Sequence, residues 1–177
     1  ARATLEIFNG MNHCVLSLQQ VTLLRSSRQI LAGVTFQVCR GELVALMGPS
    51  GSGKTTFGQA ILRLNTPDSG EIHFDHQPIH GLSRAEMRPL RARMQVVFQD
   101  PFSSLNPRMT IGQIIEEGLV VNRLGATRAE RQDRVREALI SAGMPGNILS
   151  RFPHEFSGGQ RQRIAIARAI ALEPEFI

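Results

Sequence analysis

The sequence GPSGSGKT at residues 48–55 constrains this chain more than any other feature. It matches the pattern G-x-x-x-x-G-K-S/T, in which a glycine-rich loop joins a strand to a helix and surrounds phosphate groups. Lys54 in this loop is the only lysine of the 177 residues, and every other Lys or Arg position is arginine. Because a compact ammonium fits inside a loop more readily than a planar guanidinium, the pattern predicts a phosphate-binding loop.

The residues around this lysine supply the other parts of such a site. Glycine at 48, 51 and 53 lets successive N–H groups converge on an anion, and a helix beginning near Lys54 adds its positive N-terminal end. The apolar run 42–47 predicts a buried strand before the loop, and residues 56–64 predict a helix after it. The predicted phosphate ligands are Gly48, Pro49, Ser50, Gly51, Ser52, Gly53, Lys54, Thr55 and Thr56. The Thr55 hydroxyl is also a candidate Mg²⁺ ligand.

A second glycine-containing motif, SGGQ, occupies residues 157–160. Ser157 and Gln160 have the spacing of a capping box, and apolar residues recur at helical spacing through the following stretch to Ile170. The two glycines leave N–H groups uncovered at the start of this predicted helix. By itself the motif could be only a helix cap, but it could also form a second anion site.

Together with Gln99, these motifs resemble those of the ATP-binding subunits of ATP-binding cassette (ABC) transporters. Residues 48–55 match the Walker A loop, VVFQD at 96–100 matches the Q-loop, and FSGGQ at 156–160 matches the signature motif. The resemblance extends from about residue 16 to residue 177. The segments FQDPFSSLNPR at 98–108 and RFPHEF at 151–156 look like the importer branch for oligopeptides, dipeptides and nickel, including fused proteins that import peptides or microcins.

The resemblance implies an α/β fold, with a P-loop NTPase core of the ABC ATPase type, an antiparallel β subdomain and a helical signature subdomain. The predicted parts are an irregular extension (1–14), the ATPase core with its β subdomain (15–100), the helical subdomain (101–159), and the signature helix with the start of the Walker B strand (160–177). Alternation predicts antiparallel strands at 15–21, 30–38 and 70–74. Capping-box spacing predicts helices after Ser83, Thr110 and Thr127.

In this family, two subunits pack head to tail, and each ATP lies between the Walker A loop of one and the signature motif of the other. The resemblance therefore implies that Ser157, Gly158, Gly159 and Gln160 contact ATP held by a second subunit, identical or different. It implies that Gln99 has a catalytic role, binding Mg²⁺ and orienting water. The implied partners are that second ATP-binding subunit, transmembrane permease subunits and, indirectly, a solute-binding protein. The imported solute is not encoded in this chain.

The sequence departs from the family pattern at two places. The family's Asp-Glu pair and its switch histidine would follow residue 177, so the chain is expected to be a truncated ATPase domain that binds nucleotide without hydrolysing it. The aromatic residue that usually stacks on adenine is replaced by Arg25, and the chain has no Tyr or Trp. Either the Arg25 guanidinium stacks on the base or Arg25 is a solvated turn residue.

The composition limits which binding partners and which cellular location are expected. The net charge is +5, but the arginines are dispersed among acids without interleaved aromatic residues, so nucleic acid is not predicted as a partner. Two cysteines without metal-ligand spacing suggest a reducing cytoplasm. No apolar run long enough to span a bilayer occurs, so a peripheral position on the inner face of the membrane is expected, through a permease.

Two functions remain as alternatives to a transport ATPase subunit. They are a P-loop small-molecule kinase and a nonhydrolytic nucleotide-binding remnant.

Overall fold

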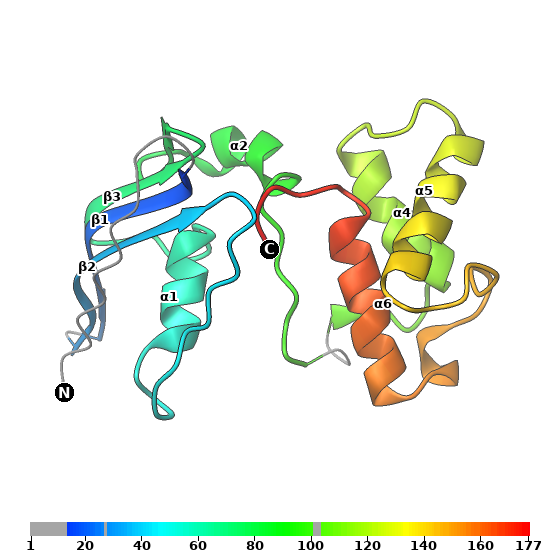
Figure 1. Ribbon diagram of the computed structural model, residues 1–177, viewed down its shortest axis with the longest axis horizontal. Helices are drawn as coiled ribbons and strands as arrows, with labels where there is room; N and C mark the ends of the chain where they lie inside the picture. The colour runs from blue at the N-terminus through cyan, green and yellow to red at the C-terminus, as the bar shows by residue number, and fades with distance from the viewer. Residues whose placement is uncertain (1–13, 27, 101–103) are drawn as a thin grey trace. The chain divides into compact units, whose positions relative to one another are not determined.

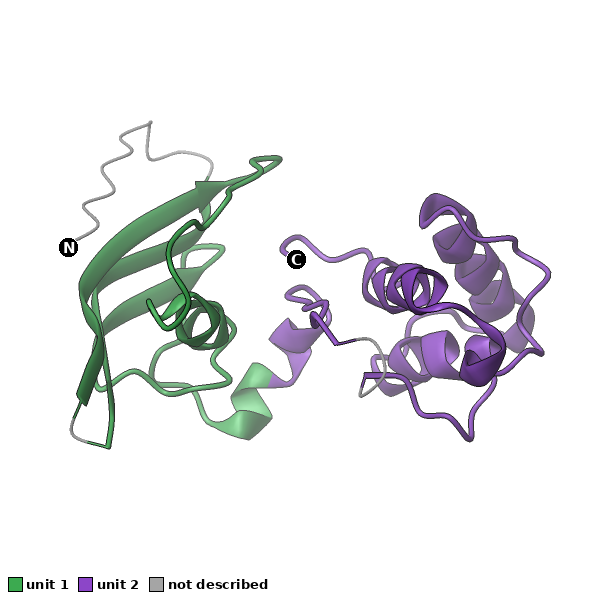
Figure 2. Ribbon diagram, turned by 90° about the horizontal axis from the view of Figure 1, so that it is seen from below, with its two compact units in different colours: residues 1–87 green, residues 88–177 purple. Residues whose placement is uncertain are grey.

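The computed structural model describes residues 14–26, 28–100 and 104–177. The chain divides into two compact units, unit 1 at residues 1–87 and unit 2 at residues 88–177 (Figure 2). The predicted extension at 1–14 lies outside the described residues except for Cys14, which begins the first strand. The other predicted domain boundaries, after residues 100 and 159, remain predictions.

Unit 1 is built on a four-stranded antiparallel sheet with the strand order β2-β1-β3-β4 (Figure 1). Its strands are β1 (Cys14–Arg25), β2 (Arg28–Cys39), β3 (Ser69–Phe74) and β4 (Gln77–Pro78). The three antiparallel strands predicted from alternation are therefore confirmed, although β1 and β2 are longer than predicted. Asp75 and His76 connect β3 to β4 with φ angles of 48° and 64°, as a tight two-residue hairpin turn of type I′ requires.

Helix α1 (Lys54–Ile61) covers one face of this sheet (Figure 1). Its buried residues Phe57, Ala60 and Ile61 recur at spacings of three and four, so they lie on one side of the helix. The ring of Phe57 meets that of Phe36 on β2 edge to face, with the centroids 5.3 Å apart. This contact fixes the helix that follows the glycine-rich loop against the sheet.

The prediction of a buried strand at residues 42–47 is wrong. These residues belong to no strand, and Leu43 and Met47 are 98% and 90% exposed. An apolar run becomes a strand only where another strand pairs with it, and within the described part of the chain no strand lies beside this segment. The helix after the loop begins at Lys54, where the motif predicted its start, and ends at Ile61, before the predicted end at residue 64.

Unit 2 is mainly helical. Its three longer helices are α4 (Ile111–Val121), α5 (Arg128–Ser141) and α6 (Gly158–Ile170), and short 3₁₀ turns occur at Pro89–Arg91 and Pro153–Glu155. The three helices share one core, in which Ile115, Leu139 and Ile164 are fully buried. An ion pair of 2.9 Å between Arg131 Nε and Glu116 Oε1 links α5 to α4.

The capping residues predicted from spacing begin helices as expected. The Thr110–Gln113 box is complete in both directions at α4, and the Ser83–Glu86 box is complete at the short helix α2 (Arg84–Met87). At α5, the Thr127 hydroxyl accepts from the N–H of Glu130, but the Glu130 carboxylate reaches the N–H of Ala126 instead. Local hydrogen bonding thus determines where these helices begin.

Residues 96–98, which precede Gln99, form no strand. Pairing in this region is limited to a parallel bridge between Met94 and Phe176. The N–H of Gln95 donates to the Phe176 carbonyl at 2.9 Å, and the Arg93 carbonyl accepts from Glu175 and Phe176. An isolated bridge does not extend into a strand, because the residues on either side of it lack further ladder partners.

The close approach of β3 to its neighbour β1 allows a test of the strand register. Gly70 has a φ of +90°, and a Cβ there would lie 2.4 Å from the Gln20 carbonyl oxygen and 2.6 Å from the Val21 Cα. Gly70→Ala should therefore lower the free energy of unfolding by about 2 kcal/mol or more in urea titrations. Gly58→Ala is the control, because no atom lies within 4 Å of that position. Equal stability of the two variants would contradict this register.

Candidate phosphate-binding sites

The loop at 48–53 takes the backbone conformations that its glycines permit. The φ angles of Gly48, Gly51 and Gly53 are 154°, 79° and 96°, in the region that L side chains rarely adopt. At Gly48 space is limiting as well, because a Cβ would lie 2.9 Å from the Ser52 hydroxyl oxygen. The loop therefore requires glycine at these positions for its geometry and not merely for flexibility.

The N-terminus of α1 is left open by this loop. Gly53 is the N-cap residue and has no side chain to satisfy the first N–H groups of the helix, and the first turn contains no acidic residue. The uncovered N–H groups and the positive end of the helix dipole point out of the same turn. This arrangement suits an anion, because an anion supplies the acceptors that the chain does not.

Lys54 is held at the mouth of this loop. Its Nζ donates to the carbonyl oxygens of Gly48 at 2.7 Å and Pro49 at 2.8 Å, and it lies 3.5 Å from Ser52 Oγ. The ammonium is thereby fixed on the loop while its charge stays beside the open N–H groups. Thr55 and Thr56 follow in the first turn of α1, where Thr55 is exposed. Their roles as phosphate and Mg²⁺ ligands remain predictions.

The second predicted site lies at the N-terminus of α6 and is organised differently. Ser157 Oγ accepts from the Gln160 N–H at 3.4 Å, and the Gln160 side chain accepts from the Ser157 N–H at 3.0 Å. The predicted capping box is thus confirmed, and it engages both side chains. Gly158 and Gly159 are exposed, and no atom lies within 4 Å of a Cβ built at Gly159. The two glycines therefore leave the backbone accessible to a ligand at this helix end.

A set of contacts that was not predicted from the sequence holds the segment before this helix in place. The Glu155 carboxylate accepts from the Phe152 N–H at 2.6 Å and from Arg151 Nε at 2.9 Å. Arg161 Nε on α6 donates to the Pro153 carbonyl at 2.8 Å. These hydrogen bonds hold the turn that leads into Ser157. The F-x-x-E spacing at 152–155 was the available signal, since an acid three residues after a turn start reaches back to its N–H.

Gln99 lies exposed in an irregular segment of unit 2. The carbonyl of the preceding Phe98 accepts from Gln162 Nε2 on α6 at 3.4 Å, and Val97 packs against the core of unit 2. The backbone beside Gln99 is therefore tethered to the signature helix. The Gln99 amide oxygen and the Thr55 hydroxyl are hard ligands of the kind Mg²⁺ prefers, but both assignments remain predictions.

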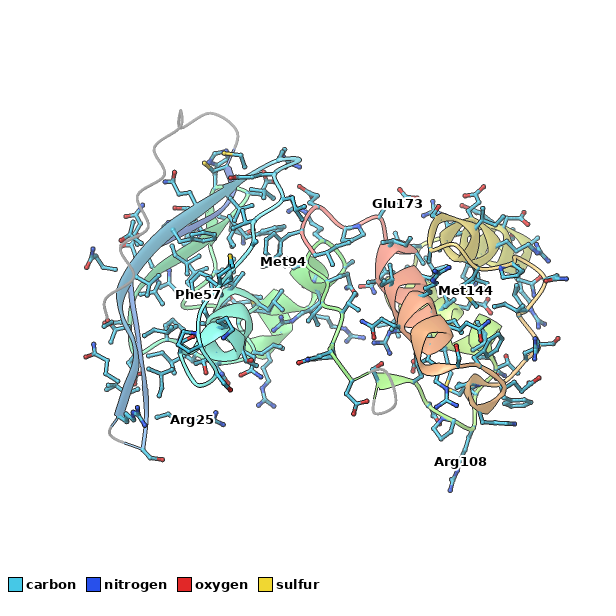
Figure 3. The ribbon with its side chains drawn as sticks, turned by 60° about the horizontal axis from the view of Figure 1, so that its bottom comes forward. Arg25, Phe57, Met94, Arg108, Met144 and Glu173 are labelled. Atoms are coloured by element: carbon cyan, nitrogen blue, oxygen red, sulfur yellow. The ribbon has the colours of Figure 1, made fainter. Side chains whose placement is uncertain are left out.

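Arg25, labelled in Figure 3, lies exposed at the end of β1. Its register partner across the strand pair is Arg28. This places it at the tip of the β1–β2 hairpin. Both the stacking role and the solvated-turn alternative are compatible with an exposed guanidinium, so the contact with adenine remains a prediction.

The described residues contain no group of three His, Cys, Asp or Glu side chains suited to a metal ion. Among the described helices, none combines the length and the apolar character needed to cross a bilayer.

The model of the family described as ABC transporter matches residues 31–177. A Brucella ovis protein named as a peptide import ATP-binding protein is 56% identical over 149 residues, which cover 84% of this chain and 47% of that protein. The oligopeptide transport ATP-binding protein OppF of Bacillus subtilis is 46% identical over 154 residues, covering 86% of this chain and 50% of that protein. The chain spans about half the length of the curated relatives it matches.

Solved structures give the same match at the level of the fold. A dimeric ATP-binding cassette in a post-hydrolysis state, bound to ADP and phosphate, is 34% identical with a TM-score of 0.80, and the match covers 90% of this chain and 70% of that one. The cbiO1 protein of Clostridium perfringens, part of an ABC transporter complex, is 30% identical with a TM-score of 0.80, covering 92% and 63%. The predicted fold class, an α/β cassette with an antiparallel sheet and a helical signature region, is confirmed.

The turn before Ser157 predicts how stability depends on pH. The hydrogen bond from the Phe152 N–H, followed by that from Arg151, lowers the pKa of Glu155 from its ordinary value of 4.5. A lowered folded-state pKa means that the stabilisation is complete above the unfolded-state pKa and is lost as pH falls through the folded-state pKa. Glu155→Gln should therefore be less stable than the wild type near neutral pH, and the difference should shrink in acid.

Urea unfolding followed by circular dichroism from about pH 7 to pH 3 would measure this difference. Glu137→Gln, which changes an exposed acid on α5, is the matched control for loss of one negative charge. A pH-independent difference between the wild type and Glu155→Gln would show that the carboxylate charge contributes nothing to this turn.

Proposed function

This chain belongs to the ABC transporter family, and from that premise we propose that it binds MgATP through the loop at residues 48–55. The observation that supports this most directly is the open N-terminus of α1 with the Lys54 ammonium fixed beside it. The triphosphate would accept from the uncovered N–H groups, and Lys54 would place one positive charge against it. Thr55 and Gln99 would supply oxygen ligands to the Mg²⁺ ion, and Gln99 would orient the attacking water.

We further propose that the protein is the energy-coupling subunit of an importer for peptides or related solutes. The names of its relatives support this branch, because they include peptide import and oligopeptide transport ATP-binding proteins. Permease subunits would be its membrane partners and a solute-binding protein an indirect one. The chain would then lie on the cytoplasmic side, peripheral to the inner face of the membrane.

The signature motif supports a role for a second subunit. One ATP molecule has a single phosphate tail, whereas this chain has two exposed glycine-containing helix N-termini, one in each unit. In the proposed dimer, the Gly158 and Gly159 region of one subunit meets the ATP held by the loop of the other. ATP would then stabilise the dimer, because it binds the closed pair better than either subunit alone. A dimeric arrangement is known for the similar cassette bound to ADP and phosphate.

A small-molecule kinase would explain only the loop at 48–55. It gives no role to the capped, exposed motif at 157–160 or to the segment at Gln99, and the family match covers residues 31–177. Transport ATPase function is therefore the proposal that uses all three motifs.

Substitution of the loop lysine tests nucleotide binding. Lys54→Ala should weaken binding of a fluorescent ATP analogue by about 10- to 100-fold, since a charge-assisted hydrogen bond contributes roughly 1.5–3 kcal/mol. Arg84→Ala is the matched control, because it removes one positive charge from an exposed position of unit 1 outside the loop. If both variants bound the analogue as the wild type does, the loop would not be the nucleotide site.

Substitution of a signature glycine separates binding across a dimer from helix stability. Gly159→Ala introduces a methyl group into open space and should preserve or slightly raise the stability of α6, because alanine favours helix more than glycine. If the Gly159 backbone meets a second subunit's ATP, the variant should lose MgATP-dependent self-association in analytical ultracentrifugation while retaining ATP binding. If MgATP-dependent self-association were unchanged, the motif would not be part of the proposed interface.

A further inference from the structure

Two cysteine thiols face each other across the edge pair of the sheet in unit 1. Cys14 on β1 is the register partner of Cys39 on β2, and their Sγ atoms are 3.8 Å apart. Both are free thiols, and both are partly exposed. They are the only two cysteines in the sequence, so they can form one intramolecular disulfide and no other.

A bulge in β1 produces this pairing. Leu16 pairs with Val38 and Cys14 with Cys39, so two residues of β1 are matched by one residue of β2. Regular pairing would have placed Val15 opposite Cys39, but Val15 is instead buried, with 2% of its surface exposed. The bulge turns Cys14 toward the face of the sheet that bears Ser17 and Gln37. The thiol pair is thus set by the strand register and not by chance proximity of two loops.

The distances permit a bond with little rearrangement. Directly opposed residues of antiparallel strands have Cα atoms about 4.5–5.5 Å apart, within the range of about 4.4–6.8 Å found across disulfides. Closing the sulfur separation to a bond of about 2.05 Å requires side-chain rotation and no exchange of strand partners.

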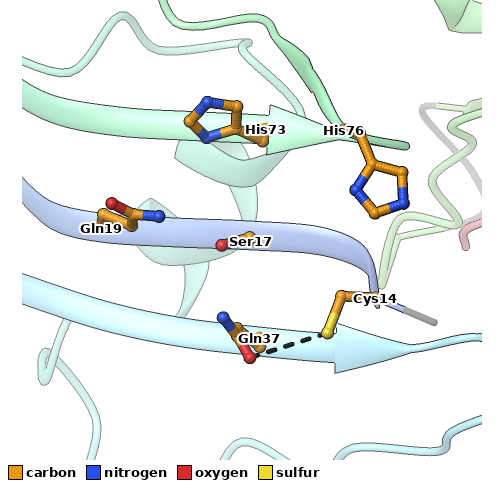
Figure 4. A pocket seen from close by; sticks show the side chains of 6 residues that line it. All are labelled: Cys14, Ser17, Gln19, Gln37, His73 and His76. Atoms are coloured by element: carbon orange, nitrogen blue, oxygen red, sulfur yellow. Dashed lines mark hydrogen bonds between the residues drawn. The ribbon is translucent and has the colours of Figure 1, made fainter. Parts of the chain in front are cut away.

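Small oxidants can reach the pair. Cys14 lines a hollow of about 220 Å³ together with Ser17, Gln19, Gln37, His73 and His76 (Figure 4). The Cys14 thiol lies 3.6 Å from Gln37 Oε1, to which it donates, so its hydrogen bonding orients the sulfur along β2. The hydrogen bond with Cys14, then burial and the nearby Glu42 raise the pKa of the Cys39 thiol, which disfavours its thiolate form.

We propose that Cys14 and Cys39 form a reversible oxidation site, at which a peroxide converts the two facing thiols into a disulfide that joins β1 to β2. Hydrogen peroxide first oxidises one sulfur to a sulfenic acid, and one water leaves. The second thiol attacks that sulfur, the S–S bond forms, the S–O bond breaks and a second water leaves. Two thiols and one peroxide thus give one disulfide and two waters, and an external dithiol reverses the reaction.

Intact-mass measurement on the purified chain tests this site. Brief treatment of the reduced protein with hydrogen peroxide should lower its mass by about 2 Da and abolish labelling of both cysteines by iodoacetamide, and dithiothreitol should restore both labels. The product should migrate as a monomer on a non-reducing gel. Two cysteines that stay available for labelling, or a product that is an intermolecular dimer, would overturn the proposal.

Variants and denaturant separate this pairing from incidental oxidation. Cys14→Ser and Cys39→Ser should each block the mass loss and instead accumulate oxygen adducts on the remaining cysteine. In concentrated urea the wild type should form the intramolecular bond at least about 10-fold more slowly, because the strands no longer hold the thiols together. Equal rates in the folded and unfolded protein would overturn the proposal.

A stability measurement adds an independent readout. The disulfide closes a loop over residues 14–39 in the unfolded chain, so the oxidised wild type should unfold at a temperature higher by on the order of 10 °C than the reduced wild type. The Cys39→Ser variant should show no such rise after the same treatment. An oxidised wild type that unfolds at the same or a lower temperature would show that the bond does not fit the native strand pair.

Discussion

The first N–H groups of a helix have no partners within the helix, and this requirement explains why the two glycine-containing motifs differ. At α6, the chain answers it with side chains, because Ser157 and Gln160 form a reciprocal box. At α1, the N-cap is Gly53, which has no side chain to offer. The N-terminus of α6 is therefore satisfied by the chain's own side chains. At the N-terminus of α1, the first N–H groups need acceptors from outside the helix. The same physical requirement is met by side-chain caps in one unit, and in the other it leaves the helix N-terminus that we propose as the phosphate site.

The Lys54 side chain further distinguishes the loop before α1 from the motif before α6. An ammonium next to an open helix N-terminus would repel it if nothing intervened, since both are positive. The Gly48 and Pro49 carbonyl groups accept from the ammonium and partly compensate its charge. The loop combines these two hydrogen bonds with glycines at positive φ, a backbone conformation that glycine adopts without steric cost. The loop thus forms around its own lysine, and a phosphate group would meet a charge that is already positioned.

Features governed by neighbours in sequence could be predicted, and those governed by distant partners could not. The capping boxes at Thr110 and Ser157 depend on three or four residues, and alternation sufficed for β1, β2 and β3. The expected strand at 42–47 failed because a strand is defined by what lies beside it, which no apolar run specifies. The Cys14–Cys39 pair was missed for a similar reason, since only a bulge in the register brings the two thiols together. For the sites, the motifs supplied the candidate residues, whose roles remain predictions, while the Glu155 turn was not predicted although its F-x-x-E spacing was present in the sequence.

Residues 42–47 separate two parts of unit 1 that can fold and open independently, the hairpin and the glycine-rich loop. The sheet is built chiefly from a hairpin whose partners are close in sequence, so its contact order is low and it can form early. The glycine-rich loop is joined to that hairpin through a stretch that adds no ladder of its own. Native-state hydrogen exchange in such a chain is governed by separate opening events of different free energy. The loop can then open locally while the hairpin keeps its protection from exchange.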